Sequence, residues 1–499
     1  MKLYKSITAT AILSFGMVMT GCSDWLDYTP KDKQTYDQQF ATASGFHTTV
    51  NGIYSSIYSS SLYGRNLSYG AIDVMGACYN IPTSNTSMNE YCSATWTGTY
   101  ASAGLESIWS SAYTAILNTN VLLQALDEFP GVLTNDDSKL IRAEMLAMRA
   151  MLHLDLTRLF SPCYAQKPDG LAVPYANTTE IVRRDRLSTA VIVNDYIIPD
   201  LNEAQSLLKE VDPVLNGSVL NTDGEDEGNW FRYRQLRLNY YAVALLKARA
   251  YMWVNDWDNA LTEAEKITDD PNVETAFPWV NPTTILGGPA RPDRVFSTEC
   301  LFGFYNSNFS DIFDTAFSGT LDPATVLQPR NAYTSVLFAN EGDYRMQSQW
   351  TSSVSVTSDY DFAKYRGFTA TANNPEFWAT FFGMMRKSEA YFIKAECLMK
   401  TDRISDAVAC LNIFRSHRGE EALSPSIAQN ALDKEIKFEY LRELRGEGQI
   451  YFLHKRNYQR FGLYSSGVYE FDGSGRCSFT DSPSIATRYN VPIPSGENY

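Results

Sequence analysis

The chain has 499 residues and carries 57 acidic against 42 basic side chains, which gives a formal net charge of −15 at pH 7. Hydrophobic residues at 44% and charged residues at 20% indicate a globular protein that is long enough to bury a large core. The acidic balance argues against nucleic-acid binding, which depends on clustered lysine and arginine. Only 4 histidines occur, which makes a histidine-built metal site hard to assemble, and we expect no metal site. We also expect no cofactor.

The N-terminus has the features of a secretory signal. Lys2 and Lys5 precede a short apolar run that ends at Gly21-Cys22, and the run is too short to span a bilayer. A cysteine at the cleavage point resembles a bacterial lipoprotein signal, in which the Cys22 thiol is lipidated. A plain secretory signal with a chance cysteine is the alternative. We therefore expect a signal peptide at 1–21 and a mature protein at 22–499, which a lipid would anchor to a membrane without spanning it.

Helical spacing of apolar residues dominates the chain and predicts an all-α fold. Trp109, Tyr113, Ile116 and Leu126 follow this spacing, and Asn135-Asp136-Asp137 is expected to cap the next helix, which runs to Leu159. Further helices are predicted over 189–210, 231–253, 257–268, 376–400, 404–418 and 426–456.

Two predicted helical hairpins repeat one another at an offset of 147 residues. Ala248, Tyr251, Trp257, Ala260 and Ala264 correspond to Ala395, Leu398, Ile404, Ala407 and Leu411. Small alanines at fixed places let two helices approach closely, as in tetratricopeptide hairpins. A chance likeness between two alanine-rich hairpins is the alternative. A long insertion separates the two units, so no simple solenoid is expected.

Two stretches lack helical spacing and are expected to form an irregular lobe with short β segments on the helical scaffold. The first, about 64–103, is rich in Ser, Thr, Asn and Tyr, and the second, about 270–375, carries many Pro, Gly, Ser and Thr. Loops on a rigid scaffold tend to hold ligand contacts. An acidic stretch, Asp223 to Gly228, is interpreted as a solvated linker rather than a cation site.

At six places in chain order the residues resemble motifs of the SusD/RagB family, outer-membrane nutrient-uptake lipoproteins of Bacteroidetes. These places are Trp25 to Pro30; Trp109 to Tyr113 with Asn120; Arg142 to Phe160; Ser388 to Glu396 with Leu411, Asn412 and Arg415; Glu439 to Arg456; and Pro492 to Pro494 with Glu497.

The resemblance implies a SusD-like domain over 22–499 and a cell-surface protein that binds an oligosaccharide or polysaccharide. It further implies a partner, a SusC-like TonB-dependent outer-membrane transporter that receives the glycan. The protein would sit on the outer membrane through its lipid, and Asp24 resembles the signal that sends such lipoproteins to the exterior face. No catalytic role is implied.

A sugar ring has an apolar face and a hydroxyl-rich edge, so binding it requires an exposed aromatic ring beside amide, carboxylate or guanidinium groups. Aromatic residues make up 13% of the chain, and those outside helical spacing are the candidates for stacking. For each candidate a purely structural role is the alternative. The predicted ligand-binding residues are Trp96, Trp350, Asp73, Tyr79, Asn80 and Arg345.

Other functions stay open at this point. The same scaffold could bind peptides, or it could be a protein-interaction scaffold with no small ligand. A glycosidase needs two facing carboxylates, but 57 acids make such a pair uninformative. We find no nucleophile elbow, zincin helix, P-loop or dinucleotide fingerprint in the sequence and expect no enzyme. Cys78 and Cys92 are the one local cysteine pair that could form a disulfide.

Overall fold

The computed structural model describes residues 35–219, 230–286, 288, 292–322, 324–329, 333–338, 340, 342–352, 360–367, 377–458 and 484–497. The predicted signal peptide, Cys22 and the acidic stretch at 223–228 lie outside these residues. Within them, no helix is both long enough and apolar enough to cross a membrane.

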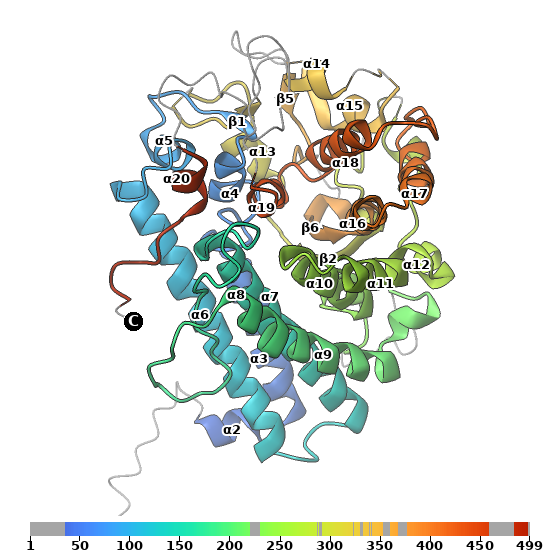
Figure 1. Ribbon diagram of the computed structural model, residues 1–499. Helices are drawn as coiled ribbons and strands as arrows, with labels where there is room; N and C mark the ends of the chain where they lie inside the picture. Colours follow the sequence, from blue (N-terminus) through green and yellow to red (C-terminus); the bar gives the residue numbers. More distant parts are fainter. Residues whose placement is uncertain are drawn as a thin grey trace, which may run out of the picture.

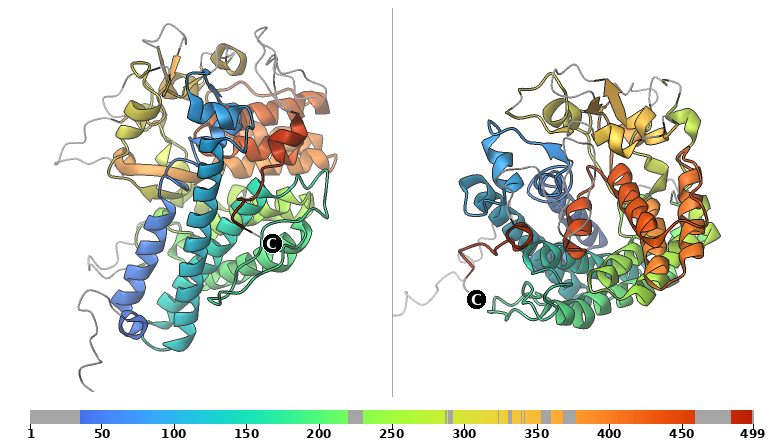
Figure 2. Two further views of the ribbon diagram at one scale, coloured as in Figure 1. Left: turned by 90° about the vertical axis from the view of Figure 1, so that its left-hand side faces the viewer. Right: turned by 45° about the horizontal axis from the view of Figure 1, so that its top comes forward.

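The protein is mainly helical, as predicted, and its long helices form a curved array (Figures 1 and 2). In this array α6 packs on α7, α7 on α9, α9 on α10, α10 on α11, α11 on α16, and α16 on both α17 and α18. The bounds are α6 Thr99–Glu128, α7 Asn135–Phe160, α9 Ile198–Val211, α10 Tyr240–Trp253, α11 Trp257–Thr268, α16 Lys387–Lys400, α17 Ile404–Ser416 and α18 Gln429–Glu443.

Further α-helices of the described residues lie outside this array. They are α2 Tyr36–Phe40, α3 Ala43–Ile57, α4 Ala71–Met75, α5 Thr86–Cys92, α8 Thr189–Val191, α12 Pro271–Ala276, α13 Asp311–Ala316, α14 Tyr333–Leu337, α15 Tyr344–Gln349, α19 Ile450–Arg456 and α20 Ile485–Tyr489. Helix α3 lies along α6 (Figure 2, left).

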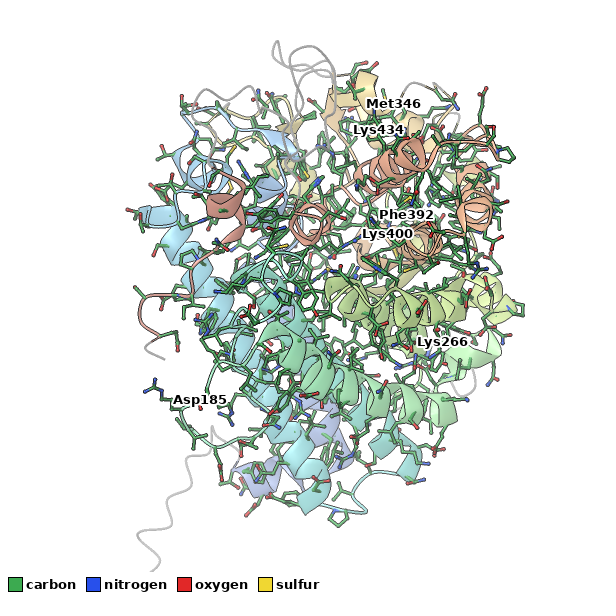
Figure 3. The ribbon with its side chains drawn as sticks, viewed as in Figure 1. Asp185, Lys266, Met346, Phe392, Lys400 and Lys434 are labelled. Carbon is green, nitrogen blue, oxygen red and sulfur yellow. The ribbon has the colours of Figure 1, made fainter. Side chains whose placement is uncertain are left out.

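The predicted repeat corresponds to two helical hairpins, α10–α11 and α16–α17. Ala248, Ala260, Ala395 and Ala407 are fully buried, as their role at close helix contacts requires. Although a long insertion separates the hairpins in sequence, α11 packs directly against α16. The two hairpins therefore stack as neighbours, as tetratricopeptide units do. Phe392 of α16 lies inside this part of the molecule, in a second hydrophobic core shared by α16, α17 and α18 (Figure 3).

One predicted helix starts nine residues later than expected. The sequence predicts 231–253, but α10 begins at Tyr240. The Asn239 side chain caps this helix by accepting hydrogen bonds from the backbone N–H groups of Tyr241 and Ala242, at 3.1 and 3.0 Å. Tyr233 has φ +55°, a left-handed conformation that a helix does not allow. The residues from Trp230 to Leu238 are therefore free to form a separate segment.

Two other predicted helices are also shorter than expected. The start of the predicted 376–400 helix is a 3₁₀ turn, Phe377–Thr380, followed by strand β6, Phe381–Arg386. The predicted 426–456 helix is divided into α18 and α19. Gly446 and Gly448, at φ +85° and +73°, adopt the left-handed conformations that make this division possible.

The strands are short and form three two-stranded antiparallel sheets. β2 (Cys300–Tyr305) pairs with β6, and its Cα partners run from Cys300 opposite Arg386 to Tyr305 opposite Phe381. β1 (Tyr79–Asn80) pairs with β3 (Gln328–Pro329), and β4 (Trp350–Ser352) pairs with β5 (Tyr360–Phe362). The two stretches predicted to be irregular thus contain short helices and small sheets.

A buried network of charges joins α18 to its neighbours. Glu443 receives ion pairs from Arg345, Arg386 and Arg418, and all four side chains are at most 1% exposed. Glu439 pairs with Arg345 at 2.8 Å. Glu439 and Glu443, which belong to a segment that resembles the family, are therefore buried and join α18 to its neighbours.

Candidate ligand-binding site

The structure corrects the first two predicted ligand contacts. Stacking on a sugar requires an exposed ring, but Trp96 and Trp350 are only 8% and 5% exposed. The Trp96 indole N–H donates to the backbone carbonyl of Thr487 at 2.8 Å and so fixes the C-terminal segment. Trp350 packs against Phe338 and Phe362 in the main core. The expectation that either ring is available for stacking was wrong.

Three of the four predicted polar contacts also lie in the interior. Asp73, Tyr79 and Arg345 are at most 1% exposed. Arg345 is part of the charge network around α18, and its guanidinium pairs with Asp343 at 2.6 Å. Their burial contradicts the expectation that they face a ligand. Only Asn80 is exposed.

The buried Asp73 carboxyl has a structural role. Burial raises the pKa of Asp73 to about 7, although the backbone N–H of Gly446 opposes this shift by donating to the carboxylate at 2.6 Å. The carboxylate also lies 3.5 Å from the Tyr79 hydroxyl. It thereby ties α4 to the turn between α18 and α19. Whether Cys78 and Cys92 pair was open from the sequence; in the structure both are free thiols.

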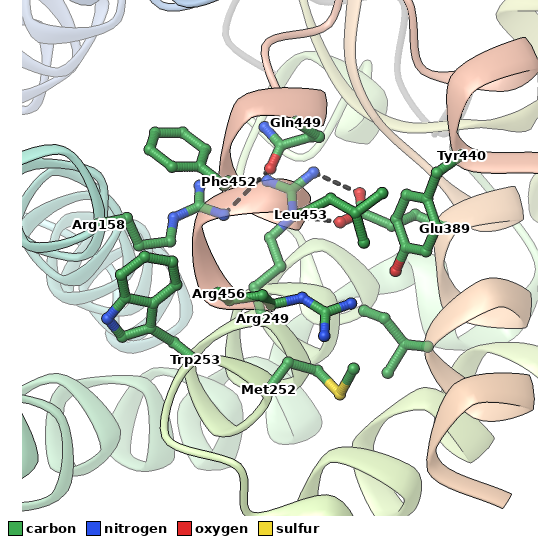
Figure 4. Close-up of a pocket in the computed structure, with 11 residues that line it drawn as sticks. Arg158, Arg249, Met252, Trp253, Glu389, Tyr440, Gln449, Phe452, Leu453 and Arg456 are labelled. Atoms are coloured by element: carbon green, nitrogen blue, oxygen red, sulfur yellow. Dashed lines mark hydrogen bonds and ion pairs between the residues drawn. The ribbon is translucent and has the colours of Figure 1, made fainter. Parts of the chain in front are cut away.

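A small internal pocket lies among α7, α10, α16 and α19 (Figure 4). Arg249 forms a bidentate pair with Glu389, and Arg158 donates to the Gln449 side chain at 3.1 Å. Its volume of about 30 Å³ is close to that of one water molecule. This pocket is too small for a sugar ring, and its other two arginines, Arg158 and Arg456, pair with Asp155 and Glu396.

A larger cleft, of about 520 Å³, opens between α3, the segment that precedes α10, and the end of β2. We call this the aromatic cleft. Its lining residues are Asn51, Tyr54, Ser55, Tyr58, Trp230, Arg232, Tyr233, Leu236, Arg237, Phe304 and Tyr305. Its size falls within the range of small-ligand sites.

Arg237 is held in the aromatic cleft by two rings and one hydrogen bond. Its guanidinium lies 4.4 Å from the ring centre of Trp230 and 4.7 Å from that of Tyr54, and it donates to the Asn51 side-chain oxygen at 2.6 Å. On Trp230, the His47 ring stacks at 4.2 Å with an interplanar angle of 6°. Burial lowers the pKa of His47, and Arg237 lowers it further although nearby acids oppose this, so the stacked imidazole is neutral at pH 7.

Two tyrosines at the aromatic cleft have exposed rings. Tyr305, the last residue of β2, is 63% exposed, and Tyr233 is 43% exposed. The left-handed backbone of Tyr233 is uncommon for a bulky residue, and such conformations tend to occur at functional positions. These rings have the exposure that Trp96 and Trp350 lack, and they offer apolar faces beside the Arg237 guanidinium and the Asn51 amide.

Arg234 fastens the cleft segment to the scaffold. It is fully buried and pairs with Glu144 of α7 at 2.6 Å and with Asp212 at 3.0 Å, both of which are fully buried as well. Asp212 also accepts the backbone N–H of Tyr240 at 3.0 Å. Because these bonds join the segment to α7 and to the start of α10, Tyr233 and Arg237 have fixed positions at the cleft.

Sequence reasoning missed this cleft because it assigned residues 231–253 to one helix. The run Phe231 to Arg234 alternates aromatic and cationic residues, and the helix-capping Asn239 follows five residues after it. Reading Asn239 as the cap would have left that run as an irregular segment with ligand-binding chemistry. Tyr305 did fall inside the predicted irregular stretch 270–375.

No group of three or more potential metal ligands occurs among the residues that the structure describes.

A family model described as "Starch-binding associating with outer membrane" matches residues 24–214, and one described as "SusD family" matches residues 316–496. The chain belongs to the SusD/RagB family. Comparison with curated proteins finds no match.

Solved structures of SusD proteins share the fold. A SusD superfamily protein from Bacteroides thetaiotaomicron is 19% identical with a TM-score of 0.68, and the match covers 91% of this chain and 97% of the other. Surface glycan-binding protein A from the same organism is 17% identical with a TM-score of 0.65, covering 93% and 97%. A SusD-like carbohydrate binding protein from Bacteroides vulgatus is 20% identical with a TM-score of 0.64, covering 90% and 94%.

Proposed function

We propose that this SusD/RagB protein is a cell-surface lipoprotein that captures oligosaccharide or polysaccharide and passes it to a TonB-dependent transporter in the outer membrane. Family membership supports the proposal, as do the names of two structural neighbours, a surface glycan-binding protein and a carbohydrate binding protein. The residues of the aromatic cleft supply the chemistry that such a ligand needs.

The observation that carries the proposal is the pair of exposed tyrosines beside a fixed guanidinium and an amide. Tyr305 and Tyr233 offer flat apolar faces for a pyranose ring. Arg237 and Asn51 offer hydrogen-bonding groups for its hydroxyl edge, and Arg237 is already held in place by its stack. A site whose groups are fixed before binding loses little conformational freedom when the ligand arrives.

Affinity gel electrophoresis of the mature protein against a polysaccharide panel tests this function. We expect retardation in at least one polysaccharide gel, weakened in Tyr305→Ala and in Tyr233→Ala. Tyr100→Ala is the matched control, because Tyr100 is 51% exposed but does not line the cleft. Full retardation of both cleft variants would reject the cleft while leaving glycan binding in place. If the protein retains peptides from a protein digest but no polysaccharide, the proposal that its ligand is a glycan is rejected.

The proposed role is binding without catalysis. The same gels, extracted and assayed for reducing ends after prolonged incubation, should show no release above that of a protein-free gel. Turnover that is abolished by replacing a single Asp or Glu would establish a glycosidase and refute this part of the proposal.

The proposed anchor and partner need separate tests. Cys22→Ser should move the protein from the outer-membrane fraction to a soluble fraction, since one lipidated residue would hold it there. Purification of the native protein in mild detergent should recover a TonB-dependent transporter. Recovery of the protein alone, under conditions that preserve other outer-membrane complexes, would contradict the transporter partner.

A further inference from the structure

The aromatic cleft is positively charged in a protein of strongly negative net charge. Its lining residues include two arginines, Arg232 and Arg237, and no aspartate or glutamate, whereas the whole chain carries −15. Neither arginine forms an ion pair with a carboxylate of the described part of the chain; the acidic stretch at 223–228 lies outside that part. An unpaired cation at a cleft attracts anions and repels like charge.

Two described residues close to this cleft, Glu144 and His47, do not cancel its charge. Glu144 approaches the cleft from α7, but it is fully buried and paired with Arg234, and it also accepts the Tyr54 hydroxyl at 3.1 Å. His47, behind Trp230, is neutral at pH 7 because burial lowers its pKa. Within the described part of the chain, the positive charge of Arg232 and Arg237 is thus left for a ligand.

The geometry of Arg237 suits an anion in particular. The guanidinium of Arg237 lies over the rings of both Trp230 and Tyr54, and its N–H donors lie along the edge of its own plane. Among the described residues that edge makes one hydrogen bond, to Asn51. A guanidinium has five N–H donors, and their planar fork matches a carboxylate or another multi-oxygen anion in bidentate fashion. A sugar hydroxyl cannot use such a fork fully.

We propose that the aromatic cleft binds glycans that carry an anionic group, a uronate carboxylate or a sulfate ester, with Arg237 as the main anion contact. Arg232 adds a second positive charge, and Tyr305 and Tyr233 contact the apolar faces of the sugar rings. The inference rests on the proposed glycan-binding function and names the chemical class of its ligand. Charge-assisted hydrogen bonds of this kind are about twice as strong as neutral ones.

The test compares matched polysaccharides that differ only in charge. Polygalacturonate is compared with its methyl ester, which has the same backbone without the charge, and dextran sulfate is compared with dextran. Alginate and hyaluronate add two further uronate backbones. We expect the wild type to bind at least one anionic polysaccharide, and to bind its neutral counterpart with at least tenfold lower affinity. Binding should weaken in 0.5 M NaCl, since salt screens exposed charges.

Variants locate the anion contact. Arg237→Gln should lower the affinity for the anionic glycan at least tenfold, and Arg232→Gln should lower it less. Arg403→Gln is the control, because Arg403 is a surface arginine of another part of the molecule that pairs with Asp406. Arg237→Lys keeps the charge without the fork, and we expect partial affinity. The thermal unfolding midpoint of each variant identifies any that fail to fold. If Arg237→Gln does not fold, the affinities of Arg232→Gln and Arg237→Lys test the anion contact instead.

Each outcome bears on the inference differently. Retention of the sulfated but of no uronate member identifies the anion as a sulfate ester, and the reverse identifies a carboxylate. Retention of neutral members alone, or equal binding to the charged and esterified forms, overturns the inference while glycan binding stands. Retention of no polysaccharide at all overturns the proposed function and, with it, this inference. Unchanged affinity in folded Arg237→Gln removes Arg237 from the site.

Discussion

The ion pairs of Arg234 provide the sharpest prediction about the scaffold behind the aromatic cleft. Arg234→Met removes the charge but keeps most of the volume of the side chain. Glu144 and Asp212, both fully buried, then lose their shared cation. Removing one partner of a buried ion pair costs about 3–5 kcal/mol of folding free energy, because the remaining charge stays buried without compensation.

The structure places the expected cost near the lower end of that range. Glu144 keeps its hydrogen bond from the Tyr54 hydroxyl at 3.1 Å. Asp212 keeps the backbone N–H groups of Val214 and Tyr240, at 3.2 and 3.0 Å. These bonds still stabilise the two carboxylates, so we expect a loss of about 3 kcal/mol for Arg234→Met.

Equilibrium urea unfolding, followed by far-ultraviolet circular dichroism at pH 7, measures this loss. With a slope of about 3 kcal/mol/M, the midpoint should fall by about 1 M. Arg142→Met is the matched control: its partner is Asp127, and the two side chains are 27% and 69% exposed. For such an exposed pair we expect a change of about 1 kcal/mol or less.

A compensating variant separates lost charge pairing from lost packing. Arg234→Met combined with Glu144→Gln and Asp212→Asn removes all three charges, and it should recover part of the lost stability. A loss of less than about 1 kcal/mol in the single variant would refute this reasoning. So would a combined variant that is less stable than the single one.

Three further predictions concern other parts of the scaffold. Burial raises the pKa of Asp73 from 3.8 to about 7, so only the folded state holds the proton between these values, and wild-type stability falls as pH rises through that window. Asp73→Asn has no carboxyl to titrate and does not lose stability in this way, so the unfolding free energy of the variant minus that of the wild type should increase from pH 4 to pH 7. Urea unfolding that gives the same difference at both pH values would contradict the assignment. Gly448 has φ +73°, and in Gly448→Ala the new Cβ would lie 2.1 Å from a backbone carbonyl oxygen, so we expect the unfolding free energy to fall by at least about 2 kcal/mol. Gly52→Ala is the control: the new Cβ would lie in open space within α3, and the unfolding free energy should rise by about 0.5–1 kcal/mol. Trp96→Phe loses the bond to Thr487, so limited proteolysis should cut the C-terminal segment faster while glycan affinity is unchanged; reduced affinity in a protease-resistant variant would restore Trp96 to the site.

The helical part of the fold was predictable because it depends on local patterns. The α11 bounds match the predicted 257–268, and the repeat of small alanines at an offset of 147 residues identified the two hairpins that stack. Boundaries failed where a single residue outweighed the apolar spacing. Asn239 delays α10, and the left-handed Gly446 and Gly448 divide the last predicted helix.

The candidate site was harder to predict because exposure depends on contacts between distant segments. Trp96 lies outside helical spacing, but a segment almost 400 residues later covers it. Nothing in the sequence around Arg345 indicates that it is buried. In the structure its guanidinium is buried because Glu439 and Glu443 of α18 pair with it. Conversely, Tyr305 closes a strand of mostly buried residues, and its exposure follows from its place at the end of β2.

The pairing of β2 with β6 has a consequence for how this protein can vary. The chain leaves the helical array at Tyr305 and returns directly opposite, at Phe381, so both ends of the intervening 75-residue excursion meet at one ladder. Exposed loops within this excursion can lengthen or shorten without moving α10 or α16, because its two ends stay in place and Arg345 still pairs with Glu439 and Glu443. Tyr305 stands at that junction. A change in the loop next to Tyr305 would therefore alter the neighbourhood of one cleft tyrosine, while Arg237 and the rings that it contacts stay the same.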